Sequence, residues 1–191
     1  TENAMYWIDL SEWLEHWDYS VIRVRDRYLK LIATYRWIQD PADVTKIVNY
    51  LRESWIKGII APERNNHWHT FIHAAKSFSW YNRLYIPKED KSDDPNDRNW
   101  QRWWLTNLVT RPMMLDEHKE LIKNKQLEMD EELQKECYTF IIKNSKPQAD
   151  DSCNDDVVMA DAICCQMLKT PQYNSWNKTQ VISVNYDDEL Y

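Results

Sequence analysis

The chain has a single glycine, Gly58, among 191 residues. Average usage would give about thirteen. It also has eleven tryptophans, several-fold more than an ordinary domain of this size. Glycine is the residue that adopts positive φ without steric cost and lets two backbones approach closely. A chain so poor in glycine therefore has few low-energy ways to make tight turns.

Two hydrophobic periodicities occur along the chain, one with the period of a strand and one with that of a helix. Their order predicts an α/β or α+β domain with a mixed sheet, in which the first three strands form an antiparallel meander. Asp40 followed by Pro41 is typical of a helix start, and Asp130 is expected to cap a second helix. Strands are expected at residues 5–8, 19–27, 29–36, 58–62 and 81–86, and helices at 40–55, 67–76, 110–125, 130–142 and 155–169.

Basic residues alternate with apolar ones in the second and third expected strands. This pattern predicts a hairpin with one solvated, basic face. Such a face either contacts nucleic-acid phosphates or is simply a solvated surface, and the pattern agrees with both. The net charge of −7 argues against passive, charge-driven binding to nucleic acid. The basic residues concerned are Arg23, Arg25, Arg27 and Lys30.

Acidic residues stand at the ends of three expected elements. Asp9 follows the first strand, Glu63 follows the strand at 58–62, and Asp155 and Asp156 open the last helix. Carboxylates in a first turn are favoured by the helix dipole, so the last two alone would indicate only a helix start. In the predicted sheet, however, the strands that end at Asp9 and at Glu63 can lie side by side, and the last helix can bring Asp155 and Asp156 to the same edge.

Carboxylates that converge in this way repel one another unless a cation lies between them. Ligands that are all oxygen suit Mg²⁺ or Mn²⁺ rather than zinc. Two such ions about 4 Å apart can activate a water and stabilise the leaving oxygen of a phosphodiester. The pattern therefore favours metal-assisted phosphodiester chemistry.

Other site classes find little support in the sequence. There is no G-K-[ST] phosphate loop and no nucleophile elbow. His69 and His73 have helical spacing but lack the glutamate of H-E-x-x-H, which favours a solvated helix face. No apolar run approaches 18 residues and no signal peptide is visible. The cysteines show no C-x-x-C spacing and are expected to be reduced thiols; they are Cys137, Cys153, Cys164 and Cys165.

Five blocks of this sequence, in the same order, resemble the signature blocks of a known family. The family is the C-terminal nuclease domain of the large terminase subunit of tailed bacteriophages, and the resemblance extends over residues 5–168. The blocks are residues 6–20, 60–70, 103–107 together with 110–112, 136–140, and 154–162.

The resemblance implies an RNase H-like fold, an α/β domain with a mixed central sheet flanked by helices. This domain is expected to span residues 1–169, with a mobile acidic loop at 88–99 and an irregular tail at 170–191. The implied activity is metal-dependent cleavage of concatemeric viral double-stranded DNA with two Mg²⁺ or Mn²⁺ ions. The implied ligands are Asp9, Glu63, and Asp155 or Asp156; Asn154 stands where many relatives have histidine.

The family acts in the host cytoplasm, transiently at the procapsid portal. The implied partners are therefore the portal protein and the small terminase subunit, with no role for a membrane. The packaging ATPase of the family has no counterpart in these residues, so no translocation activity is expected from them. Alternatives are a non-catalytic prophage remnant, a portal-docking module, or another RNase H-like nuclease such as a resolvase.

Several tryptophans fall where members of this family have glycine. We hypothesise that the source organism reads UGA as glycine and that the sequence was translated with UGA as tryptophan. This accounts for the glycine deficit and the tryptophan excess together, and UGG codons at these positions would refute it. The alternative is a diverged or decayed gene that tolerates tryptophan. The positions are Trp7, Trp13, Trp17, Trp37, Trp68 and Trp103.

Overall fold

A four-stranded mixed sheet forms the centre of the molecule. The computed structural model describes residues 3–11, 19–63, 67–85, 106, 109–143 and 146–169. The strand order is β3-β2-β1-β4, in which β1, β2 and β3 are antiparallel neighbours and β4 runs parallel to β1. The predicted mixed sheet with an antiparallel meander is therefore confirmed. The strands are β1 (Ala4–Asp9), β2 (Ser20–Asp26), β3 (Leu31–Trp37) and β4 (Gly58–Pro62).

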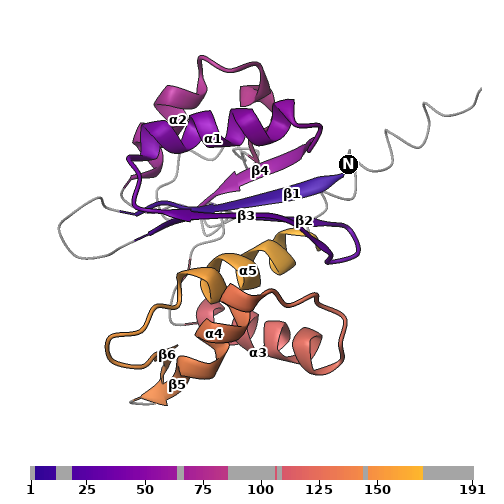
Figure 1. Cartoon of the computed structure of the whole chain (residues 1–191), viewed down its shortest axis with the longest axis vertical. Coiled ribbons are helices and arrows are strands. Elements are labelled where there is room, and N and C mark those ends of the chain that lie inside the picture. Colours follow the sequence, from indigo (N-terminus) through magenta and orange to yellow (C-terminus); the bar gives the residue numbers. More distant parts are fainter. Residues whose placement is uncertain are drawn as a thin grey trace, which may run out of the picture.

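Helices cover both faces of this sheet (Figure 1). On one face lie α1 (Pro41–Glu53) and α2 (Trp68–Ala75), and on the other lie α5 (Asp156–Met167), α4 (Glu131–Thr139) and α3 (Thr110–Lys123). Each face has its own apolar core, and successive residues of β1 contribute to the two cores in turn. In the described residues, no helix is long and apolar enough to cross a membrane.

Local capping signals place two helix starts where the sequence predicts them. The carboxylate of Asp40 accepts a hydrogen bond from the backbone N–H of Ala42, and Pro41 begins α1. The carboxylate of Asp130 likewise accepts from the N–H of Leu133 in α4. Each cap satisfies an N–H group that has no partner within its own helix.

Helix α5 differs from its prediction, because the sequence indicates one buried face and the structure buries the helix all round. Every residue from Val157 to Met167 is buried. The reason is position, since α5 lies between the sheet and the helices α3 and α4.

Two segments near the expected elements form different structures. Residues 79–83 form the 3-10 helix η1 (Ser79–Arg83), and of the described residues 81–85 of the expected strand, only Leu84 bridges to Ile60. The helix expected at 130–142 ends early, and its last residues form β5 (Phe140–Lys143), which pairs with β6 (Lys146–Ala149). A short apolar run fits a strand or a helix end equally well, so periodicity alone could not separate them. The segments 88–99 and 170–191 lie outside the described residues.

The only glycine does not serve a turn. Gly58 begins β4, where a Cβ atom would lie 1.8 Å from the carbonyl oxygen of Ala4, so the close pairing of the two strands excludes any side chain. Among the described residues, positive φ is instead adopted by non-glycine residues, namely Leu29, Trp55, Lys125 and Ser152.

Trp55 occupies the position after α1 that usually belongs to glycine. Its φ is 70°. Its N–H donates to the carbonyl of Arg52 (3.2 Å), and the N–H of Ile56 donates to that of Leu51 (3.4 Å). These two bonds form a Schellman motif, whose left-handed residue is most often glycine. Because the Trp55 side chain is 77% exposed, little packing compensates for the strained backbone.

We expect Trp55→Gly to raise the free energy of unfolding by about 1 kcal/mol, because glycine reaches this φ without strain. Urea denaturation of both proteins measures the difference. The matched control is Tyr50→Gly, an exposed aromatic residue inside α1, which should lower the free energy by about 1 kcal/mol. An unchanged or lowered stability of Trp55→Gly would contradict the prediction.

Candidate metal centre

Asp9 and Glu63 lie at the same edge of the sheet. Ile8 of β1 is paired with Pro62 of β4, and the N–H of Glu63 donates to the carbonyl of Ile8 at 2.7 Å. Both carboxylates therefore follow neighbouring parallel strands at their carboxyl ends. Strand alternation also directs both side chains to one face, because Trp7, two residues before Asp9, and Ala61, two before Glu63, pack in the core on the α5 side.

The first turn of α5 lies on the same face of the sheet and contacts β3 there. Asp156 lies 3.5 Å from Nη2 of Arg36, measured at its Oδ2 atom. Arg36 is paired across the sheet with Val21, and Val21 is paired with Asp9. Asp156 therefore approaches the cross-strand row that runs from Arg36 through Val21 to Asp9.

Positive and polar groups accompany these carboxylates. Arg111 of α3 contacts Oδ2 of Asp155 through Nη2 at 2.5 Å, and its Nε donates to the carbonyl of Pro147 at 3.2 Å. The hydroxyl of Thr106 donates to Oε1 of Glu63 at 2.9 Å. Arginine thus supplies, at Asp155, some of the positive charge that a bound cation would bring.

The four predicted ligands do not form a tight coordination sphere. Among the described residues, Asp9, Glu63, Asp155 and Asp156 do not bring three oxygen atoms within 4.8 Å of one another. They are nevertheless all carboxylates at one edge, a donor set that suits a hard cation such as Mg²⁺ or Mn²⁺. The site fits such ions by its chemistry and would have to contract around them.

A second group of residues has three donor atoms close enough to share one metal ion, but its surroundings are poorly suited to a cation. His118, Asp161 and Cys165 offer donor atoms within 4.8 Å of one another, and all three are buried. Two guanidinium groups, those of Arg23 and Arg25, already contact Asp161 and would repel a metal ion. Burial also raises the pKa of the Cys165 thiol, which therefore stays protonated and binds metals weakly.

Asp161 is the centre of a buried ionic network between α5 and the sheet. Its carboxylate accepts from Nε of Arg23 at 3.1 Å, from Nε of Arg25 at 2.7 Å, and contacts Nε2 of His118 at 2.8 Å. Arg23 also binds the carboxylate of Asp130 in two hydrogen bonds of 2.8 and 3.1 Å. The network therefore joins β2, α3, α5 and the start of α4.

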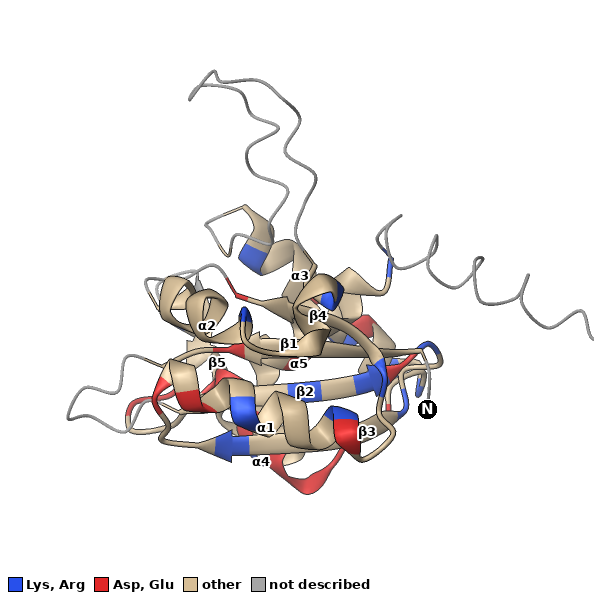
Figure 2. Cartoon of the chain, turned by 90° about the horizontal axis from the view of Figure 1, so that it is seen from above, with Lys and Arg blue, Asp and Glu red and all other residues tan. Residues whose placement is uncertain are grey.

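The prediction that the hairpin has a basic, solvated face is wrong for Arg23 and Arg25. Both side chains are fully buried, and the basic residues of β2 lie in the middle of the sheet (Figure 2). Arg27 and Lys30 are exposed, but they follow the end of β2 at which Asp26 pairs with Ala4. That end is five residues along β1 from Asp9, about 17 Å away at the usual rise of a strand.

Sequence reasoning did not single out Asp161, although a signal for it is present. It is one carboxylate within a long apolar run, Val157 to Met167, where only Gln166 is also polar. A charge in such a segment requires a buried partner of opposite sign. The alternating arginines of the hairpin were available to be that partner.

The order of the sheet and the helices on its two faces define an RNase H-like α/β domain. Solved structures with this arrangement include the large terminase nuclease of thermophilic phage G20c, at 17% sequence identity and a TM-score of 0.55, over 85% of this chain and 81% of that one. A second structure of the same nuclease, with bound cobalt, gives 14% identity and a TM-score of 0.59, over 85% and 80% of the two chains. The fold that the sequence resemblance implied is therefore confirmed. No protein-family model and no curated protein sequence matches the chain.

We expect Asp161→Asn to lower the free energy of unfolding at pH 7 by about 3–5 kcal/mol, because two buried guanidinium groups lose their shared charge partner. Burial alone would raise the pKa of Asp161, but the His118 hydrogen bond and the charges of Arg25 and Arg23 bring it below its usual value. The stabilisation is therefore complete above the unfolded pKa of about 3.9 and is lost as the pH falls below it.

Urea denaturation of parent and variant between pH 7 and pH 2 measures this difference. Asp116→Asn, which changes an exposed carboxylate of α3, is the matched control and should alter stability by less than about 0.5 kcal/mol. A loss below about 1 kcal/mol for Asp161→Asn at pH 7 would show that the buried network contributes little.

Proposed function

We propose that the chain is the metal-dependent endonuclease domain of a phage DNA-packaging terminase. The observation that carries the proposal is the position of Asp9 and Glu63, side by side at the carboxyl ends of β1 and β4 and on the face that α5 covers. The fold supports a nuclease in general, because its structural neighbours are two structures of a terminase nuclease, one of them with bound cobalt.

In this proposal Asp9, Glu63, Asp155 and Asp156 hold two Mg²⁺ or Mn²⁺ ions. Such ions activate a water and stabilise the leaving oxygen of a phosphodiester. The hydroxyl of Thr106 orients the Glu63 carboxylate through its hydrogen bond to Oε1. Arg36 and Arg111 balance the charge of the α5 carboxylates whenever no cation is bound.

The proposed substrate is concatemeric viral double-stranded DNA, and the proposed partners are the portal protein and the small terminase subunit in the host cytoplasm. Arg23 and Arg25 are excluded from the DNA-contact surface by their burial. Arg27 and Lys30 remain proposed phosphate contacts, on DNA that extends along the sheet beyond the cleavage point.

We expect the purified chain to nick supercoiled plasmid DNA in Mn²⁺ or Mg²⁺ and to stop when EDTA is added. Asp9→Ala and Glu63→Ala should each reduce the rate by on the order of 10²–10³-fold, because each removes a ligand of the ions. Cys165→Ala is the control and should cut at the parent rate. Cys165 belongs to the buried cluster with His118 and Asp161, and this cluster has no part in the proposed reaction. Cutting that persists in EDTA or in both alanine variants would exclude this function.

The two exposed basic residues predict a salt effect. We expect the double variant Arg27→Ala/Lys30→Ala to bind duplex DNA with a weaker dependence on salt, its log–log slope reduced by up to about 1.8. Fluorescence anisotropy with a labelled duplex over a range of NaCl concentrations measures the slope. The catalytically inactive Asp9→Ala background prevents cleavage during the titration. An unchanged slope would remove both residues from the DNA-contact surface.

A further inference from the structure

The buried start of α5 needs partners for its N–H groups, and its own N-cap residue does not provide them. Asp155 is the N-cap residue, yet its side chain makes no capping hydrogen bond. Its carboxylate instead faces Arg111. A helix start away from water must satisfy these groups in another way.

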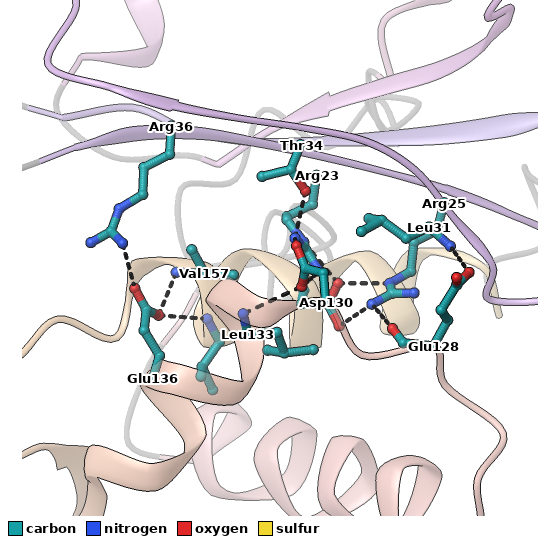
Figure 3. A network of polar contacts seen from close by, with 12 residues as sticks. Arg23, Arg25, Leu31, Thr34, Arg36, Glu128, Asp130, Leu133, Glu136 and Val157 are labelled. Carbon is teal, nitrogen blue, oxygen red and sulfur yellow. Dashed lines mark hydrogen bonds and ion pairs between the residues drawn. The ribbon is translucent and has the colours of Figure 1, made fainter.

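Glu136 of α4 provides this cap from a different helix (Figure 3). One carboxylate oxygen, Oε2, accepts from the N–H of Val157 at 2.8 Å and from that of Val158 at 3.0 Å. The side chain is only 6% exposed. Hydrogen bonds from N–H groups to an ionised carboxylate are stronger than neutral ones, and here the helix dipole adds to them.

Arg36 connects this cap to the edge of the sheet. Its Nη1 atom lies 3.3 Å from Oε1 of Glu136 and its Nη2 atom 3.5 Å from Asp156. Its guanidinium also stacks over the ring of Tyr19 at 4.3 Å. Since Arg36 is in the cross-strand row that ends at Asp9, the first turn of α5 is tied to the strand end that carries this carboxylate.

We propose that Glu136 is a positioning residue of the metal centre. The carboxylate of an aspartate at an N-cap normally accepts hydrogen bonds from the N–H groups of the first turn. Because Glu136 makes those bonds instead, the carboxylates of Asp155 and Asp156 are not used to cap the helix. They lie beside Arg111 and Arg36, and Arg36 belongs to the cross-strand row that ends at Asp9. This inference rests on the proposed function and assigns to Glu136 no direct contact with metal or DNA.

The test compares three variants by calorimetric titration with Mn²⁺. Glu136→Ala removes the cap and should weaken Mn²⁺ binding by about 10–100-fold, as is typical when a group that orients a ligand is lost. Glu136→Gln retains an oxygen acceptor and should bind within about threefold of the parent chain. Glu131→Gln, in the exposed first turn of the same helix, is the matched control and should bind like the parent.

A second measurement uses the parent chain, so its result does not depend on whether the Glu136 variants fold. Amide hydrogen exchange of Val157 and Val158 should stay slow when Mg²⁺ is added, because Glu136 keeps both hydrogen bonds. Faster exchange of these amides with Mg²⁺, or equal loss of Mn²⁺ binding in Glu136→Gln and Glu136→Ala, would show that Glu136 is itself a ligand.

The remaining outcomes separate this inference from the proposed function. Parent-like Mn²⁺ binding by Glu136→Ala would overturn the positioning role and leave the nuclease proposal intact. Failure of the parent chain to bind Mn²⁺ would overturn the proposed function, and the role of Glu136 with it.

Discussion

The structure depends on one buried charge, that of Asp161, and on the two arginines that neutralise it. An isolated carboxylate in an apolar interior is strongly unfavourable, so α5 can occupy its place only if Arg23 and Arg25 of β2 face it. Apolar contacts alone would allow α5 to slide or rotate against the sheet. Hydrogen bonds of fixed direction do not, and they set the position at which the first turn of α5, with Asp155 and Asp156, meets the edge of the sheet.

That edge concentrates charges of both signs. The carboxylates of Asp9 and Glu63 come from neighbouring parallel strands, and those of the α5 start are each beside an arginine, Arg111 or Arg36. Like charges at this spacing destabilise a fold unless cations compensate them. Arg111 and Arg36 provide part of that compensation for the α5 carboxylates.

The tryptophans also bear on the origin of the sequence. Trp7 is buried in the core on the α5 side, and its indole N–H finds no acceptor within the described part of the chain. A buried indole normally satisfies this group. Trp55 adopts a left-handed backbone that favours glycine. Both features are compatible with the hypothesis that UGA codons for glycine were translated as tryptophan, which the codons at these positions test.

Local patterns in the sequence determined most of the elements and the meeting of the ends of β1 and β4. A short apolar run predicts β1 and alternation predicts β2 and β3, while the pairs Asp40–Ala42 and Asp130–Leu133 follow from capping rules that act within three residues. The acids at Asp9 and Glu63 could be placed together because adjacent parallel strands end at one edge. All of these features depend on residues close in the chain or on the order of the elements.

Only the tertiary structure decided which arginines are buried and which residue caps α5. Alternation shows that Arg23 and Arg25 share a face of the hairpin, but it does not show whether a helix covers that face. Their partner, Asp161, lies 138 and 136 residues away, and the cap of α5 comes from Glu136, 21 and 22 residues before the amides it binds. Hydrogen bonds between distant segments have no period in the sequence, because they depend on where each element packs.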